Sequence, residues 1–408
     1  MRLVLVTGLG GSGRTTVAAA TALAAARSGR RTLLLTAGGA SVLGAPVGIE
    51  PVDVAERMWA ARIDSGAHFR RELLAFQERC TGALDLLGAR KLEDEELTEL
   101  PGSEQFALLK ALRELRRGAV WDTVVVDMPP VHETIALLGL PEQLRRYVRR
   151  LLPPERQAAR ALRPVLAQLA GVPMPARWLY ESAARWETEL SAVQQLIEDT
   201  DTTVRLVAEP GPAAEDALLT ARLGVALYGM RVDAVVANRI LPSASPDPWL
   251  AGLRAQQEKA LDRWHQESGP GTGTVPLLPV AHLGRDPRGL DDLSALAPAL
   301  GMGPEPEAAD HPEPWDIRRA PSSGVGRGGS GDASEGELHW VLPLPGAVKE
   351  ELGLVRRGDE LLVTVGPFRR VLPLPPVLRR CTVSGAGLRD GELRIRFTPD
   401  PAVWPQRR

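Results

Sequence analysis

A glycine-rich segment near the N-terminus has the composition of a phosphate-binding loop. It reads GLGGSGRTT, and its polar and glycine residues are Gly8, Gly10, Gly11, Ser12, Gly13, Arg14, Thr15 and Thr16. Glycines let backbone amides wrap a phosphate chain, and a following helix offers its positive N-terminus to the anion. The placement directly after an apolar run and the paired threonines favour this interpretation over an ordinary strand-to-helix turn. The segment therefore predicts nucleotide binding.

A second polar position lies at the end of the apolar run WDTVVVD, where Asp127 closes the run. A carboxylate there can hold a Mg²⁺-bound water beside a nucleotide, and the Thr15 hydroxyl can ligate the same ion. A cap for the next turn is the alternative role for Asp127. His132 and Glu133 follow it, and they could contact a γ-phosphate or serve as turn residues. Together, Thr15 and Asp127 predict a Mg²⁺ site.

The elements that must position these residues alternate between short apolar runs and helical patterns. The runs are near-continuous in Val, Leu, Ile and Ala, as a parallel sheet covered on both faces requires. The predicted strands are 2–7, 31–36, 58–63, 121–127, 204–208 and 233–237. A helix is expected from Thr15 to Arg27, ending at Ser28-Gly29. This pattern is typical of an α/β fold with a doubly wound, mostly parallel sheet.

The chain divides into a large α/β domain over residues 1–302 and a small C-terminal all-β sandwich over 338–400. Helix-forming sequence at about 141–200 predicts a helical subdomain inserted between two strands of the first domain. Residues 303–337 are rich in Gly, Pro, Ser, Asp and Glu, so we expect a disordered linker there. The C-terminal domain has short β-type segments separated by Gly-Asp and Asp-Gly turns.

Composition excludes several partners. The 408 residues carry a formal net charge of -2, which gives no field that would collect nucleic acid. Two cysteines, Cys80 and Cys381, supply neither a disulfide framework nor a zinc site, so a cytoplasmic location is expected. We expect no transmembrane segment, since no apolar run approaches about 18 residues.

The chain resembles the arsenical pump-driving (ArsA) and tail-anchored-protein-targeting ATPases, in particular their actinobacterial members. The matching blocks are the phosphate loop with its helix, LPGSEQFALL, VVVDMPPVHETIALLGLPE and RVDAVVANRILP. From about Leu338, the sequence is similar to the small-heat-shock-like domain that often ends these proteins. The resemblance implies a P-loop NTPase fold, ATP and Mg²⁺ as cofactors, and a dimer.

Residues around the phosphates depart from the family pattern. The family has two lysines in the loop, one reaching across the dimer and one contacting the β- and γ-phosphates, and this chain has Leu9 and Arg14 there. A planar guanidinium differs from the point charge of an ammonium group. Residues 36–40 read Thr-Ala-Gly-Gly-Ala, without the carboxylate that positions the attacking water in the family. The resemblance thus implies that no catalytic residue of the family is securely intact.

Other family positions are partly retained. Asn238 matches the asparagine that recognises adenine, and Arg239 beside it is included in the predicted nucleotide site; a strand-end turn is the alternative role for Asn238. Glu209-Pro210-Gly211 aligns with a nucleotide-sensing Asn-Pro-Glu motif whose glutamate is displaced or absent here. The cysteine pair that clamps zinc in the targeting members is missing.

These departures predict an ArsA-like protein with retained or weakened ATP binding and little hydrolysis. Each lost positioned group typically costs about 10²-fold or more in rate. We expect this protein to act as a regulatory or pseudo-ATPase partner of an intact paralogue. We also expect it to form a homodimer or a heterodimer with an ArsA-like paralogue. The alternative is a slow ATPase that drives anion transport or the handling of protein clients. A relationship to partitioning ATPases ranks last, because neither a basic face nor a C-terminal amphipathic helix is present.

Two regions suggest contacts with a protein client or a membrane-protein partner. The inserted helices place large apolar groups on about one face, either as a client groove or as core packed on the sheet; they are Trp178, Leu179, Tyr180, Trp186 and Leu190. A basic cluster at 145–150 indicates a solvated helical face rather than a nucleic-acid patch. The C-terminal domain could hold exposed apolar segments of partners or serve as a docking module.

Overall fold

The computed structural model describes most of the chain. The described residues are 1–38, 40–79, 92–98, 102–118, 120–151, 176–243, 246–267, 275–301, 315–319 and 337–404. The chain forms two compact units, Met1–Val207 with Val280–Gly303, and Ala208–Pro279 with Pro304–Arg408. None of the helices within those ranges is long and apolar enough to cross a membrane.

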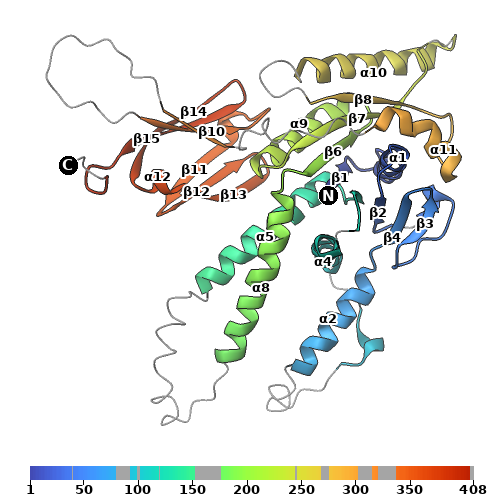
Figure 1. The fold of residues 1–408 in the computed structure, drawn as a ribbon. Coiled ribbons are helices and arrows are strands. Elements are labelled where there is room, and N and C mark those ends of the chain that lie inside the picture. Colours follow the sequence, from blue (N-terminus) through green and yellow to red (C-terminus); the bar gives the residue numbers. More distant parts are fainter. Residues whose placement is uncertain are drawn as a thin grey trace. The chain divides into compact units, whose positions relative to one another are not determined.

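The first unit contains a mostly parallel sheet (Figure 1). Its strands lie in the order β3-β4-β2-β5-β1-β6. They are β1 (Arg2–Gly8), β2 (Thr32–Thr36), β3 (Val52–Ala55), β4 (Met58–Arg62), β5 (Thr123–Asp127) and β6 (Thr202–Ala208). β1 pairs in parallel with β5 and β6, β2 pairs in parallel with β4 and β5, and β3 alone is antiparallel. All residues of β1, β2 and β6 are buried, as their apolar composition predicts.

The first unit also contains helices. The described ones are α1 (Arg14–Arg27), α2 (Ser65–Arg79), α4 (Ser103–Gly118), α5 (Val131–Leu151), α8 (Ala176–Ile197) and α11 (Gly289–Leu296), with 3-10 turns η1 (Ala40–Leu43), η2 (Asp94–Glu96) and η3 (Ala297–Leu300). α1 packs on β5 and β2. Nearly all of its alanines are buried, because their small side chains let the helix approach the sheet closely. It ends at Ser28, followed by Gly29 with a φ of 90°. The expected helix is therefore present.

The helical insertion begins earlier than predicted. We expected it from about Pro141, but α5 starts at Val131 and runs through Pro141. A proline inside a helix costs a backbone hydrogen bond. Here Val131, Ile135 and Leu138 are buried, and this apolar face offsets the cost. The helix that leads into the predicted insertion therefore begins before Pro141.

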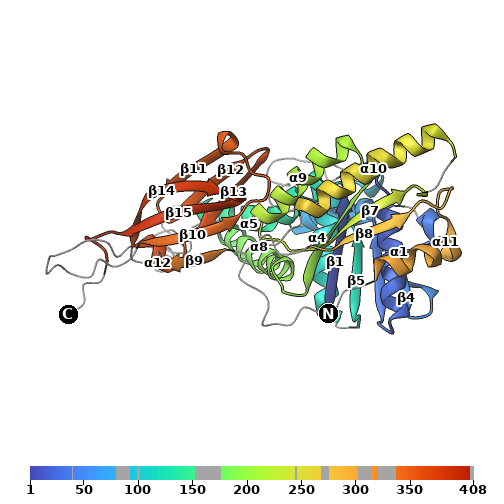
Figure 2. The ribbon, with the colours of Figure 1, turned by 90° about the horizontal axis from the view of Figure 1, so that it is seen from above.

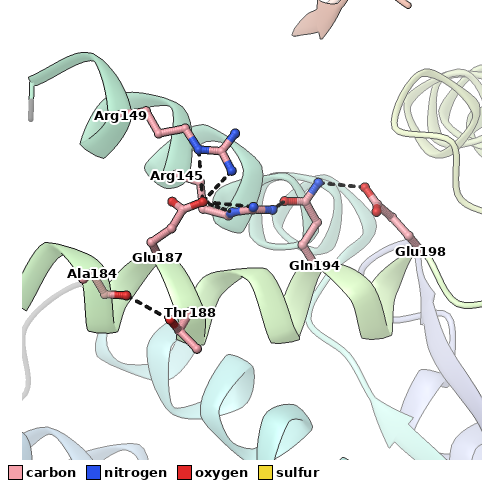
Figure 3. Close-up of polar contacts among 7 residues, drawn as sticks. All are labelled: Arg145, Arg149, Ala184, Glu187, Thr188, Gln194 and Glu198. Atoms are coloured by element: carbon pink, nitrogen blue, oxygen red, sulfur yellow. Dashed lines mark hydrogen bonds and ion pairs between the residues drawn. The ribbon is translucent and has the colours of Figure 1, made fainter. Parts of the chain in front are cut away.

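Ion pairs join α5 to α8, which lie side by side (Figures 1 and 3). Glu187 Oε1 accepts hydrogen bonds from Arg145 Nε and Arg149 Nε, each at 3.0 Å. Arg145 also binds Gln194, whose amide donates to Glu198 Oε1 at 2.8 Å. Two arginines of the basic cluster at 145–150 are thus paired with a carboxylate of the neighbouring helix.

The predicted apolar face of the insertion is only partly described. Trp186 is 61% exposed, and Leu190 is half-buried. The side chains of Trp178, Leu179 and Tyr180 lie outside the described residues. Tyr147 and Leu151 on α5 are also exposed, at 51% and 79%. The described part of this face therefore contains exposed aromatic and aliphatic groups as well as packed ones.

The second unit combines further α/β elements with two antiparallel sheets, the latter coloured orange to red in Figure 2. The α/β elements are α9 (Pro212–Leu227), β7 (Val232–Ile240), α10 (Pro248–Glu267) and the start of β8 (Leu277–Ala281). One sheet has the order β11-β12-β13 and the other β14-β15-β10-β9. The segments are β9 (Asp316–Arg319), β10 (Leu338–Pro343), η5 (Lys349–Glu351), β11 (Leu352–Arg357), β12 (Glu360–Val365), β13 (Phe368–Pro373), α12 (Pro376–Arg379), β14 (Cys381–Arg389) and β15 (Glu392–Pro399).

The core of the C-terminal sheets follows strand periodicity. Along β15, Leu393, Ile395 and Phe397 are fully buried, and along β12 the buried residues are Leu361, Val363 and Val365. Alternate residues of a strand point to opposite faces, so each strand contributes one apolar face to the core. The predicted fold class, an α/β P-loop domain with a helical insertion and an all-β C-terminal domain, is confirmed.

The predicted linker contains a strand. We expected 303–337 to be disordered, but β9 at Asp316–Arg319 pairs antiparallel with β10. Trp315, directly before β9, packs edge-on against Trp340, with ring centroids 6.4 Å apart. Composition averaged over the segment hid the short run WDIRR, whose aromatic side chain gives the strand a partner in the core. The remaining residues of the predicted linker, apart from Glu337, lie outside the described ranges.

A buried arginine fastens the C-terminal sheets to α9 within the second unit. Arg370 on β13 is 7% exposed and donates to the Leu227 carbonyl at the end of α9, at 3.0 Å. Its guanidinium lies over the rings of Trp315, at 4.5 Å, and Tyr228, at 5.3 Å. The Tyr228 hydroxyl donates to the Arg369 carbonyl at 3.2 Å. A cation at a helix C-terminus also interacts favourably with the helix dipole.

We expect Arg370→Met to lower the free energy of unfolding by roughly 2–3 kcal/mol, because it removes a charged hydrogen bond and two cation–π contacts. Arg369→Met is the matched control, since the Arg369 side chain is exposed and only its backbone contacts Tyr228. Urea unfolding followed by tryptophan fluorescence measures both variants. Equal stability of the two variants would contradict this role of Arg370.

Candidate functional site

The glycine-rich loop connects β1 to α1 in a conformation that needs glycine. A Cβ on Gly8 would lie 2.0 Å from the Val207 carbonyl oxygen of β6, so a side chain cannot fit there. Gly11 and Gly13 have φ angles of 75° and 86°, in the left-handed region. The Ser12 hydroxyl donates to the Leu9 carbonyl at 2.8 Å and fixes the turn. Gly10 and Gly11 are exposed, which leaves their backbone open to a ligand.

Two side chains at the start of α1 point to the end of β5. Thr15 Oγ1 donates to Asp127 Oδ2 at 2.8 Å, so the two residues predicted to form a Mg²⁺ site lie in direct contact. Arg14 Nη1 donates to the Met128 carbonyl at 2.7 Å. Thr16 is half-buried in the same turn. β1 and β5 are parallel neighbours, which explains how residues so distant in sequence meet at one edge of the sheet.

The Asp127 carboxylate lies in an environment that disfavours its charge. Burial raises the pKa of Asp127 above its ordinary value, while hydrogen bonds from Thr15 and Thr36 and the charge of Arg14 act in the opposite direction. Thr36 Oγ1, at the end of β2, donates to Asp127 Oδ2 at 3.2 Å. A cation bound at this carboxylate would stabilise its ionised form.

The donor chemistry of this pair fits Mg²⁺. A threonine hydroxyl and an aspartate carboxylate are hard oxygen donors, and Mg²⁺ is commonly held by one or two protein oxygens together with substrate phosphates and water. Thr15 and Asp127 would supply those protein oxygens, directly or through a bound water. The ion would supply charge neutralisation for the phosphate chain.

Some supporting residues were missed by the sequence reasoning. Thr7 and Thr134 both donate to the Pro129 carbonyl, at 2.7 and 2.8 Å, and hold the segment that follows β5. Thr36 was missed as a partner of Asp127. The sequence did contain a signal for them. Thr7 and Thr36 lie at or near the ends of two apolar runs, and the strands formed by these runs neighbour the strand that ends in Asp127.

The other predicted residues lie on α5 and β7. His132 and Glu133 are exposed in the first turn of α5. Asn238 and Arg239 belong to the second unit, inside β7 rather than in a turn after it. Asn238 is 6% exposed. Their role as nucleotide contacts stays a prediction.

Arg239 has an unusual backbone. Its φ of 59° lies in the left-handed region, which is uncommon for a residue other than glycine. Gln257 on α10 donates to the Arg239 carbonyl at 3.0 Å and accepts from the Leu241 amide at 2.9 Å, which holds this conformation. The Arg239 guanidinium pairs with Glu209 at 3.2 Å. Glu209 therefore contacts the residue that follows Asn238.

The site has the arrangement of a P-loop NTPase. A strand leads through a glycine-rich loop into a helix, and an aspartate lies on the adjacent parallel strand. Comparison with known proteins identifies the family. Residues 1–300 match the model described as Anion-transporting ATPase, and residues 335–397 match an HSP20-like domain found in ArsA. The chain belongs to the ArsA ATPase family.

Relatives cover essentially the whole chain. "Uncharacterized protein SCO2128" of Streptomyces coelicolor is 54% identical over 413 residues and covers 100% of both chains. "Protein Rv2184c" of Mycobacterium tuberculosis is 30% identical over 434 residues, covering 99% of this chain and 97% of its own. "Putative arsenical pump-driving ATPase 1" of Aquifex aeolicus is 25% identical over 413 residues, covering 97% of this chain and 99% of its own.

We expect Asp127→Asn to raise the thermal midpoint of the nucleotide-free protein at pH 7. The raised pKa means that folding disfavours the charged form, so the charge lowers stability above the unfolded pKa of about 4 and has no effect below it. The gain should therefore disappear as the pH falls through that value. Asp216→Asn, on the exposed face of α9, is the control and should change little. A midpoint lowered at pH 7 would contradict the prediction.

Proposed function

We propose that this protein binds Mg-ATP but hydrolyses it slowly, and that it acts as a regulatory partner of an intact ArsA-like paralogue. The observation that carries the proposal is the contact of Arg14 with the Met128 carbonyl at 2.7 Å. Arg14 stands where the family has the lysine that contacts the β- and γ-phosphates, and its guanidinium binds the backbone that follows β5. Thr15 and Asp127, the residues proposed to hold Mg²⁺, lie in direct contact with each other.

Several features support binding. The exposed glycines leave backbone amides available, and α1 is a helix of 14 residues without an acidic residue in its first turn. The positive end of its dipole therefore faces no acidic side chain of its own first turn, which favours an anion. Thr15 and Asp127 provide oxygen donors for Mg²⁺. None of these groups depends on the two substituted lysine positions.

Slow hydrolysis is inferred from the groups that are substituted. Leu9 offers no charge to a partner's nucleotide, and residues 37 and 38, alanine and glycine, offer no carboxylate beside the site. Phosphoryl transfer depends on positioning and charge neutralisation, and each lost positioned group typically costs about 10²-fold or more. The effects are not additive, so the total reduction is smaller than the product.

The regulatory role follows from this chemistry. A subunit that binds ATP but turns it over slowly can hold one nucleotide state. An intact partner retains its own loop lysines and the carboxylate that positions the attacking water. Co-expression with an intact paralogue tests the pairing: a stable heterodimer is expected, and an exclusive homodimer would contradict it.

A slow ATPase that handles protein clients is the second candidate. It is favoured by the exposed Tyr147, Leu151 and Trp186 on the helical insertion, since large apolar groups on a surface indicate contacts with other molecules. Anion transport has no specific support among the described residues. Client binding would predict that ATP changes the accessibility of these side chains.

Arg14→Lys should raise the turnover of the protein about 10-fold, because a lysine cannot reproduce the planar guanidinium contact and its ammonium group can reach phosphate oxygens. ATP affinity, followed by calorimetry, should change little. Arg27→Lys, at the opposite end of α1, is the matched control. Steady-state phosphate release by the unmodified protein tests the premise, and turnover as fast as that of an ordinary enzyme would overturn the proposal of slow hydrolysis.

Thr15→Val should weaken ATP binding in Mg²⁺ by about 10-fold and leave binding in EDTA nearly unchanged, because it removes a hydroxyl ligand without changing the loop backbone. Thr188→Val on α8 serves as the control, since that threonine is exposed and bonds only within its helix. Equal weakening with and without Mg²⁺ would show that Thr15 acts on the loop rather than on the ion.

A further inference from the structure

A small recess lies beside the Thr15–Asp127 pair. Its walls include Ala37 after β2, Ile63 after β4, Asp127 at the end of β5, and Glu104 and Gln105 in the first turn of α4. These strands are parallel neighbours, so the recess is at the carboxyl edge of the sheet. Ligands of open α/β sheets bind at this edge. The recess is therefore placed where a nucleotide's reacting end would be.

One atom of the recess residues is unusual. Gln105 Oε1 is buried from solvent and has no hydrogen-bond partner among the described residues. A buried acceptor without a donor lowers stability, so native structures seldom keep one unless a water, an ion or a ligand satisfies it. The amide oxygen of Gln105 thus indicates a missing hydrogen-bond donor.

The chemistry of the site suggests which donor is missing. Hydrolysis of a phosphoryl group needs a residue that orients the attacking water, and a glutamine amide serves this purpose in some P-loop enzymes. Ala37 and Gly38, which follow β2, have no side-chain acceptor. Asp127 Oδ2 accepts from Thr15 and Thr36, and the Asp127 carboxylate is assigned to the proposed Mg²⁺ site. Glu104 and Gln105 are the remaining side chains of the recess that carry oxygen acceptors.

We propose that Gln105 Oε1 accepts a hydrogen bond from the nucleophilic water and that the Glu104 carboxylate accepts its proton. This assignment rests on the proposed function, because it explains the slow hydrolysis that remains. The water oxygen forms a bond to the γ-phosphorus, and the bond from that phosphorus to the β–γ bridging oxygen breaks, leaving its electron pair on ADP. The proton held by Glu104 then passes to the phosphate product or to solvent.

Gln105→Met tests the assignment because its shape is similar and its buried oxygen is removed. We expect the thermal midpoint of the nucleotide-free protein to rise by roughly 2 °C or more, since an unsatisfied acceptor is lost. The single-turnover rate should fall at least 10-fold, and the preference for Mg-ADP-fluoroaluminate over Mg-ADP in calorimetry should fall by a similar factor. A residue with only a structural role would instead lower the midpoint.

Gln256→Met, an exposed glutamine of α10, is the matched control for both measurements. Glu104→Gln should lower the single-turnover rate about 10-fold without changing Mg-ATP affinity, and Glu95→Gln, which is exposed in η2, should leave both unchanged. If the unmodified protein does not bind Mg-ATP, the proposed function fails and this inference with it. If it binds Mg-ATP but Gln105→Met leaves the rate and the analogue preference unchanged, this inference alone is overturned.

Discussion

Two threonine hydroxyls from different elements bind one oxygen of the Asp127 carboxylate. Thr15 comes from the start of α1 and Thr36 from the end of β2. This oxygen therefore links three segments that are distant in sequence, α1, β2 and β5, at one edge of the sheet. Burial of the carboxylate strengthens these hydrogen bonds. Burial also disfavours the charged form of the carboxylate, which raises its pKa. The phosphate loop, the Thr15–Asp127 pair and the recess beside Gln105 all meet at this arrangement.

The substituted residues around this carboxylate have different consequences for binding and for chemistry. Backbone amides, the dipole of α1 and the two oxygen donors are properties of the fold, and they persist when side chains such as those at positions 9 and 14 change. Catalysis needs charges placed at specific points, and it is lost more readily. A P-loop protein can therefore keep a nucleotide site while its turnover declines, which is the combination that we propose for this protein.

Much of the fold followed from the sequence because its signals were local. The buried runs of β1, β2 and β5 and the glycines of the loop determine their own structure, and the pairing of Thr15 with Asp127 follows from parallel strands ending at one edge. Gln105 could not be found this way, because the lack of a hydrogen-bond donor for its Oε1 among the described residues is a result of tertiary packing. Two further features also depend on tertiary packing: burial of an apolar face keeps α5 helical through Pro141, and Trp315 packs beside a strand within polar sequence.

The strand β9 also changes how the C-terminal domain should be delimited. Residues 316–319 cover one side of β10 by antiparallel pairing, and Trp315 lies against Trp340 of the core. A fragment that began at Leu338 would leave the hydrogen-bonding groups of β10 open along that side, and an uncovered edge strand pairs readily with other chains. Such a fragment could aggregate or capture extended peptides for reasons unrelated to chaperone activity. An isolated domain has to begin before Trp315 if its behaviour is to represent the intact protein.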